Sequence, residues 1–185
     1  MVFGDVLTML PFLIPAYIVN DMYLSGAFIL MSLSGVLHHY YIESDILLTF
    51  DLLSILITLI ILTNKSKITE GIKKIIILSQ ITVFVAFVIL SLLKIRLPWR
   101  IHLIIMSVAW LPLFIFLVPF SSNITKVLMI LAGVNYMIHT CSCDFKYEMT
   151  NITWGISHVL TAALAYFIVN DLNLVKPMFS IKKVF

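Results

Sequence analysis

Apolar runs long enough to cross a lipid bilayer, separated by short polar breaks, restrict the fold of this chain more than any other feature. A helix needs about 20 predominantly apolar residues to span the hydrocarbon core of a bilayer. Reading the apolar runs against the polar breaks predicts seven such spans. They cover residues 2–19, 22–39, 45–63, 75–93, 101–120, 124–141 and 152–169. The sequence therefore predicts an all-α fold, a polytopic seven-transmembrane helical bundle.

The composition also favours a protein that lipid surrounds. Of the 185 residues, 62% are hydrophobic and only 11% are charged, and the mean hydropathy is +1.11. Soluble domains are about half apolar and a quarter charged, so we expect membrane lipids to cover the excess apolar surface. Seven spans of about 20 residues use roughly 140 residues. We therefore expect one domain over residues 1–185, with a short cytosolic tail at 170–185 and no attached soluble domain.

The first two spans have the shortest predicted connection. Asn20 and Asp21 separate two apolar runs that would together make about 37 residues, too long for one crossing even when tilted. Two spans are therefore predicted, with Pro11 and Pro15 kinking the first. The N-terminus has no basic region and carries Asp5, which argues against a cleaved signal peptide.

The distribution of basic residues predicts an orientation. With seven spans, alternate loops share a side of the membrane. One side carries Lys94, Arg96, Arg100 and Lys146. The other side carries Lys65, Lys67, Lys73, Lys74, Lys126, Lys176, Lys182 and Lys183. Because cytosolic loops are enriched in lysine and arginine, we expect an exoplasmic N-terminus and a cytosolic C-terminus. No basic stripe is interleaved with aromatic residues, so nucleic-acid binding is not indicated; the host membrane and the oligomeric state stay open.

The titratable residues of the spans suggest where chemistry could take place. All five histidines fall near the same predicted side of the membrane: His38, His39, His102, His139 and His158. Asp51 is the acidic residue that lies well inside a predicted span, about 9 Å below that side at 1.5 Å per residue. A carboxylate in hydrocarbon is costly and is usually paired or functional. Asp51 is therefore a candidate functional residue, the alternative being a buried hydrogen-bonding partner for a neighbouring helix.

Spacing adds two more groups to this candidate site. Ser34 and His38 are four residues apart, so they share one face of a helix, and His158 enters from the seventh span. Imidazoles from two helices, a carboxylate and a hydroxyl could hold a zinc ion and a water, whose pKa zinc lowers toward about 7. In this hypothesis Asp51 acts as the base or orients the water. Ser34 donates a hydrogen bond to the developing oxyanion.

These motifs resemble a known superfamily. The pattern Ser34-Gly-Val-Leu-His38, an aspartate at 51 and a late histidine in Trp154-Gly-Ile-Ser-His158 is similar to the CREST-type membrane hydrolases. That superfamily contains alkaline ceramidases, adiponectin receptors, GPI-remodelling proteins and myomaker. The resemblance implies a seven-span bundle with Ser-x-x-x-His on the second span, Asp on the third and His-x-x-x-His on the seventh. It also implies that three histidines hold zinc.

Two branches of the superfamily compete. Residues 157–161, Ser-His-Val-Leu-Thr, are similar to the ceramidase motif. Residues 37–39 followed by residues 45–47 resemble myomaker. The first branch implies a zinc-dependent lipid amide or ester hydrolase whose substrate enters sideways from the bilayer. The second implies a non-catalytic protein of membrane fusion or remodelling, or a structural bundle, in which the histidines are structural.

One departure from the pattern bears on catalysis. Trp154 stands where the first histidine of His-x-x-x-His is expected. The expected zinc ligands are then His38, His158 and His139, with His39 or Asp51 as alternatives to His139. The sequence leaves open weak zinc binding, a different set of ligands, or loss of catalysis.

Overall fold

The computed structural model describes residues 7–40, 45–95, 97–142 and 147–179. These residues form seven α-helices joined by short turns, and they contain no β-strand, which confirms the all-α class. The helices are α2 (Leu13–Ile18), α3 (Met22–Tyr40), α4 (Asp45–Lys65), α5 (Glu70–Leu92), α6 (Trp99–Leu117), α7 (Asn123–Ser142) and α8 (Tyr147–Asp171). Three 3-10 turns accompany them: η1 (Leu10–Phe12), η2 (Val118–Phe120) and η3 (Pro177–Phe179).

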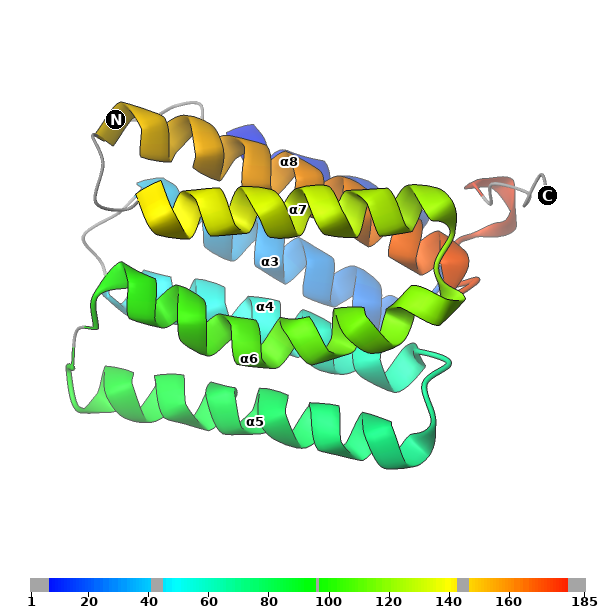
Figure 1. Cartoon of the computed structure of the whole chain (residues 1–185), viewed down its shortest axis with the longest axis horizontal. Helices are drawn as coiled ribbons and strands as arrows, with labels where there is room; N and C mark the ends of the chain where they lie inside the picture. The colour runs from blue at the N-terminus through cyan, green and yellow to red at the C-terminus, as the bar shows by residue number, and fades with distance from the viewer. Residues whose placement is uncertain (1–6, 41–44, 96, 143–146, 180–185) are drawn as a thin grey trace.

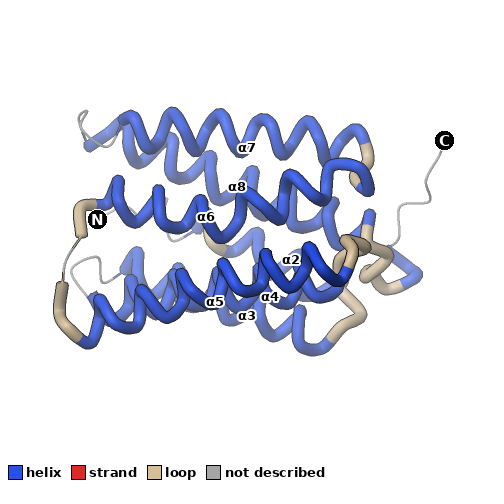
Figure 2. The backbone as a smooth tube through the Cα atoms, turned by 60° about the horizontal axis from the view of Figure 1, so that its bottom comes forward, coloured by secondary structure: helices blue, strands red, loops and turns tan. Residues whose placement is uncertain are grey.

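Helices α3 to α8 run alternately in opposite directions, so that consecutive helices are antiparallel (Figure 1). Each helix packs against the next along the chain, and α4 also contacts α6. The segment η1–α2 contacts both α3 and α8 and thereby joins the beginning of the chain to its end. Figure 2 shows the same helices as a bundle of roughly parallel axes, with the described loops at its two ends.

Three of the helices are long and apolar enough to cross a membrane: Ile46–Lys65, Glu70–Leu92 and Ile101–Phe120. Met22–His38 and Asn123–Ile138 form shorter apolar helices. Exposed large apolar side chains occur on all of these helices. Soluble monomers rarely expose so much contiguous apolar surface, and a lipid environment accounts for it.

The first predicted span differs from a single long helix. Its described part consists of helical residues 7 and 8, a turn at Met9, the 3-10 turn Leu10–Phe12 and the six residues of α2. Pro11 lies in the 3-10 turn and Pro15 lies in α2, and each proline removes a backbone donor. The described part of this span therefore changes from 3-10 to α-helix near the two prolines, and residues 1–6 lie outside the described part.

Two helices start earlier than the sequence predicts, because they extend beyond their apolar cores. Helix α5 starts at Glu70 rather than at residue 75, and α8 starts at Tyr147 rather than at residue 152. Polar residues at helix ends contribute little to a hydropathy pattern but continue the backbone hydrogen bonds. The loops between the helices are accordingly shorter than the apolar pattern predicts.

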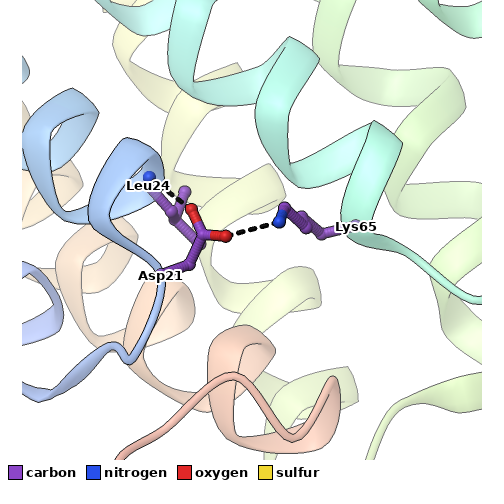
Figure 3. A network of polar contacts seen from close by, with 3 residues as sticks. All are labelled: Asp21, Leu24 and Lys65. Atoms are coloured by element: carbon purple, nitrogen blue, oxygen red, sulfur yellow. Dashed lines mark hydrogen bonds and ion pairs between the residues drawn. The ribbon is translucent and has the colours of Figure 1, made fainter.

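Asp21 stabilises the turn between α2 and α3 through two hydrogen bonds (Figure 3). Its Oδ1 accepts a hydrogen bond from the Leu24 backbone N–H at 2.9 Å, and its Oδ2 accepts one from the Lys65 ammonium at the end of α4. The Lys65 hydrogen bond, with the Leu24 amide, holds the pKa of the Asp21 carboxyl below its usual value. The stabilisation is therefore present at neutral pH and is lost as the pH falls through that lowered pKa.

The segment that follows α8 pairs with the same turn. Val19 and Val175 form an isolated antiparallel bridge, and the Asn20 N–H donates to the Leu174 carbonyl at 2.8 Å. Asn173, with φ of 60°, occupies the left-handed conformation that ends many helices and redirects the chain. The turn between α2 and α3 and the segment after α8 are thus joined at one end of the bundle.

Gln80 forms a buried polar contact between three helices. Its side chain is fully buried. The amide Nε2 donates to Thr63 Oγ1 of α4 at 2.9 Å and to the Ala109 carbonyl of α6 at 3.2 Å. Pro112, three residues after Ala109, interrupts the backbone hydrogen bonds of α6 nearby. Gln80 therefore ties α4, α5 and α6 together inside the apolar bundle.

Replacing Gln80 tests this contact. We expect Gln80→Leu to lower the free energy of unfolding in detergent micelles by about 1 kcal/mol, the usual size of an interhelical hydrogen bond among apolar helices. Ser79→Ala is the matched control, because the Ser79 hydroxyl donates to the Ile76 carbonyl of its own helix. Equal stability of the Gln80→Leu protein and the wild type would contradict a stabilising role.

Candidate functional site

Ser34 and Asp51, two of the residues predicted from the sequence, are in direct contact. The Ser34 hydroxyl donates to Asp51 Oδ1 at 3.0 Å and lies 2.7 Å from the Ser54 hydroxyl. Ser34 and Ser54 are fully buried, and Asp51 is 6% exposed. The three side chains form a polar group, the Ser34–Asp51–Ser54 cluster, between two apolar helices.

The antiparallel packing of α3 and α4 explains the contact. Ser34 lies six residues before the end of α3 at Tyr40, and Asp51 lies six residues after the start of α4 at Asp45. At 1.5 Å per residue, both are about 9 Å from the connection between the two helices. Two residues at equal depth on adjacent antiparallel helices come side by side, which accounts for the contact between Ser34 and Asp51.

Ser54 completes the cluster from the same helix as Asp51. It lies three residues further along α4, which places it on the same helix face. The Ser54 hydroxyl also lies 2.7 Å from the Asp51 carbonyl oxygen, to which it donates. A buried carboxylate with two neighbouring hydroxyls can accept a proton, orient a water molecule or receive a hydrogen bond, and no charged partner is needed for any of these roles.

His158 forms a hydrogen bond with Thr8, near the beginning of the chain. It is buried on α8, and its Nδ1 lies 2.8 Å from Thr8 Oγ1. His158 is 11 residues after the start of α8 at Tyr147, about 16 Å along the axis. It is deeper along its helix than the sequence prediction of about 9 Å, because α8 begins earlier than predicted.

Met9, the neighbour of Thr8, lies against α3. Its carbonyl accepts a hydrogen bond from the Ser32 hydroxyl at 3.0 Å. Its side chain covers Gly35, where a built Cβ would lie 2.0 Å from Met9 Cε. Thr8 and Met9 together therefore connect His158 on α8 with α3 one residue away from Ser34.

The contact between Met9 and Gly35 gives a stability prediction. We expect Gly35→Ala to destabilise the protein by about 1–2 kcal/mol, since an added methyl group overpacks the interface and the Met9 side chain must move. The measurement is the free energy of unfolding in micelles. When Gly35→Ala is combined with Met9→Ala, most of the destabilisation caused by Gly35→Ala should disappear.

Gly26→Ala on the same helix is the control for this prediction. A Cβ at Gly26 would meet nothing within 4 Å, and alanine favours a helix by up to about 1 kcal/mol over glycine. We expect this variant to be at least as stable as the wild type. A Gly35→Ala protein that behaves like Gly26→Ala would contradict the close packing of Met9 on α3.

The remaining predicted residues have different positions. His38 is half-buried on α3, one turn beyond Ser34 towards the end of the helix. The His102 ring stacks on Phe87 of α5, with ring centroids 5.6 Å apart, which places it at the contact between α5 and α6. His139 and Trp154 lie on α7 and α8, but their side chains are outside the part that the structure describes.

The described residues do not by themselves fit a zinc ion. A zinc site needs at least three protein ligands. Within the part of the chain that the structure describes, no group of three or more His, Cys, Asp and Glu side chains could hold a metal ion. His38, Asp51 and His158 thus do not form such a group.

No family model matches the chain, and neither a curated protein nor a solved structure matches it.

Two residues of the site were missed by the sequence analysis. Ser54 could have been found, because it follows Asp51 at the three-residue spacing that places two side chains on one helix face. Thr8 carries no such signal. Its contact with His158 joins residues 150 positions apart in the chain, and only the packing of the first segment against α8 creates it.

Proposed function

We propose that this chain is a membrane-embedded hydrolase of lipid amides or esters, of the type that alkaline ceramidases represent. The observation that supports the proposal is the contact between Ser34 and Asp51, two residues of the motif, buried side by side between apolar helices. A carboxylate and a hydroxyl at that position are costly unless they serve structure or chemistry. The surrounding apolar surface favours a substrate drawn from the bilayer.

In this proposal Asp51 is the base and Ser34 stabilises the developing charge. Asp51 takes a proton from water as the water oxygen bonds to the carbonyl carbon. As Asp51 is protonated, the Ser34 hydroxyl, which donates to Asp51 Oδ1 in the free protein, turns its single O–H to the oxyanion that forms. When the bond to the leaving nitrogen or oxygen breaks, the proton passes from Asp51 to that atom, which regenerates the carboxylate.

We also propose the full seven-span topology of the chain and a bound zinc ion. All seven apolar segments cross the bilayer, with the N-terminus exoplasmic and the C-terminus cytosolic, as the distribution of lysine and arginine favours. Zinc is an expectation that comes from the resemblance, with His38, His158 and His139 as the residues that would hold it.

A lipid panel and a metal analysis test the proposal together. The purified protein, in lipid nanodiscs, is incubated with ceramides and phospholipids, and released fatty acid is measured by mass spectrometry. We expect release from at least one lipid class and stoichiometric zinc in the sample. A zinc-free protein in which His38→Ala changes no activity would overturn the zinc-dependent hydrolase.

A non-catalytic membrane-remodelling protein resembling myomaker is the second candidate. Trp154 at the position of an expected zinc ligand favours it, as does the hydrogen bond that gives His158 a structural partner in Thr8. This candidate predicts no fatty-acid release from any lipid of the panel. Turnover that disappears in Asp51→Asn would exclude it.

A further inference from the structure

Helix α5 has an exposed apolar stripe that begins at a lysine. The buried residues of this helix share one face and are Ile76, Gln80, Val83 and Phe87. On the opposite face an exposed side chain recurs every three or four positions, the spacing of one helix face: Lys74, Leu78, Ile81 and Val85. From the first to the last of these, the helix rises about 16 Å, half of the roughly 30 Å hydrocarbon core of a bilayer. The stripe therefore has the length of one lipid leaflet.

Helix α7 repeats this arrangement. Its inward face has the buried Thr125 and three partly buried residues that pack against the core, Leu128, Met129 and Ala132. Its outward face begins at the partly exposed Lys126 and continues through three exposed apolar residues, Ile130, Val134 and Met137. Helices α5 and α7 start at the same end of the bundle (Figure 1). Two stripes of the same length thus have a lysine at the same end.

The ammonium groups of these two lysines are not neutralised within the described part of the chain. There, Lys74 and Lys126 make no side-chain hydrogen bond and no ion pair. Glu70, one turn before Lys74, pairs with Lys73 instead, with 2.8 Å between Oε1 and Nζ. A lysine at the end of an apolar helix face extends its charged group to the level of the lipid headgroups. Each stripe thus offers a cation to a headgroup and an apolar surface to a hydrocarbon chain.

We propose that α5 and α7 each bind an anionic phospholipid, whose headgroup phosphate pairs with Lys74 or Lys126 and whose acyl chains lie along the stripe. Charge complementarity favours an anionic lipid over a zwitterionic one. A lysine at an anionic membrane surface contributes about a fivefold gain in affinity. This binding goes beyond the proposed hydrolysis, because the Ser34–Asp51–Ser54 cluster lies on α3 and α4 and the lipid on each stripe is not the substrate.

Native mass spectrometry of the full-length protein tests the proposal. The protein in detergent micelles is titrated with phosphatidylglycerol or with phosphatidylcholine of the same acyl chains, and the Kd of each lipid is measured from the bound fractions. We expect phosphatidylglycerol to bind about fivefold more tightly at each of two sites. The double variant Lys74→Gln with Lys126→Gln should bind both lipids equally, and the corresponding double arginine variant should keep the preference.

Lys73→Gln is the matched control for Lys74→Gln. It removes the same unit of charge from the adjacent position, but the Lys73 side chain is only 12% exposed and pairs with Glu70. We expect Lys73→Gln to keep the preference for phosphatidylglycerol at two sites and Lys74→Gln to keep it at one. Equal losses in these two variants would overturn the proposal, because the general charge of this end of the bundle would then suffice. Circular dichroism of each variant establishes that the bundle is intact.

Three other results would also contradict lipid binding at the stripes. The first is an equal Kd of the wild type for the two lipids. The second is displacement of phosphatidylglycerol by glycerol phosphate, which carries the headgroup without acyl chains and would indicate a site for free phosphate. The third is a dimer of the chain that excludes the lipid, which would mean that a second copy covers the stripes.

Discussion

Asp51→Asn is expected to lower the release of fatty acid from the lipid substrate by at least about 100-fold, the usual range for removal of a general base. The substitution is nearly isosteric. The asparagine Oδ1 can still accept the hydrogen bond that Ser34 donates to Asp51, so the helices should remain packed. Unfolding in micelles should therefore change little, and the loss of activity can be assigned to the carboxylate. The measurement is the initial rate of release by mass spectrometry.

Ser54→Ala is the matched control for Asp51→Asn. It removes a hydroxyl that neighbours Ser34 in the same buried cluster but leaves the carboxylate and its contact with Ser34 in place. We expect a small change in rate, less than about 10-fold, which corresponds to one hydrogen bond. Equal losses in Asp51→Asn and Ser54→Ala would mean that the cluster serves packing and that Asp51 has no chemical role.

Asp171→Ala is expected to destabilise the protein by about 2–4 kcal/mol, because the buried Thr125 hydroxyl and the half-buried Ser122 N–H lose their acceptor. Asp171 Oδ2 accepts hydrogen bonds from the Ser122 backbone N–H at 2.8 Å and from Thr125 Oγ1 at 2.6 Å. Both donors lie at the start of α7, where a negative charge is favourable to the helix dipole. Ser122 makes the usual capping interaction, since its Oγ accepts from the Thr125 N–H at 3.3 Å. The carboxylate at the end of α8 adds hydrogen bonds from another helix that hold Ser122 and Thr125 in place.

Two further variants test whether the loss of stability in Asp171→Ala comes from its hydrogen bonds. Asp171→Asn keeps an acceptor oxygen and should lose less stability than Asp171→Ala in the same unfolding assay. Glu70→Ala also removes a carboxylate at a helix start, but Glu70 is exposed and pairs with Lys73, so it should change stability little. An Asp171→Ala protein as stable as Glu70→Ala would show that α7 does not depend on this contact.

The sequence predicts the helices well because their signal is local. Long apolar runs define α4, α5 and α6, and the polar breaks between them predict the turns. The prediction was least accurate at helix ends, where residues 70–74 and 147–151 belong to helices although they are not part of an apolar run. Within the described residues 7–19, a 3-10 turn that contains Pro11 interrupts the predicted span.

The candidate site was predictable where helix geometry determines it. Ser34 and Asp51 stand at equal distances from the connection between α3 and α4, so antiparallel packing alone brings them together. Thr8 and Asp171 could not be found in this way, because their partners His158 and Thr125 lie far away in the sequence. Contacts of this kind depend on how distant segments pack, and the local pattern of one sequence does not reveal that packing.

Hydrolysis of lipid in water enriched in oxygen-18 tests the central claim most directly. The wild-type protein in nanodiscs is supplied with ceramides and phospholipids in labelled water, and the released fatty acid is weighed by mass spectrometry. Addition of water to the carbonyl predicts a fatty acid that carries the heavy oxygen in its carboxyl group, with at least about 100-fold less formed by Asp51→Asn. Unlabelled or absent fatty acid across the whole panel would contradict a hydrolase centred on Ser34 and Asp51.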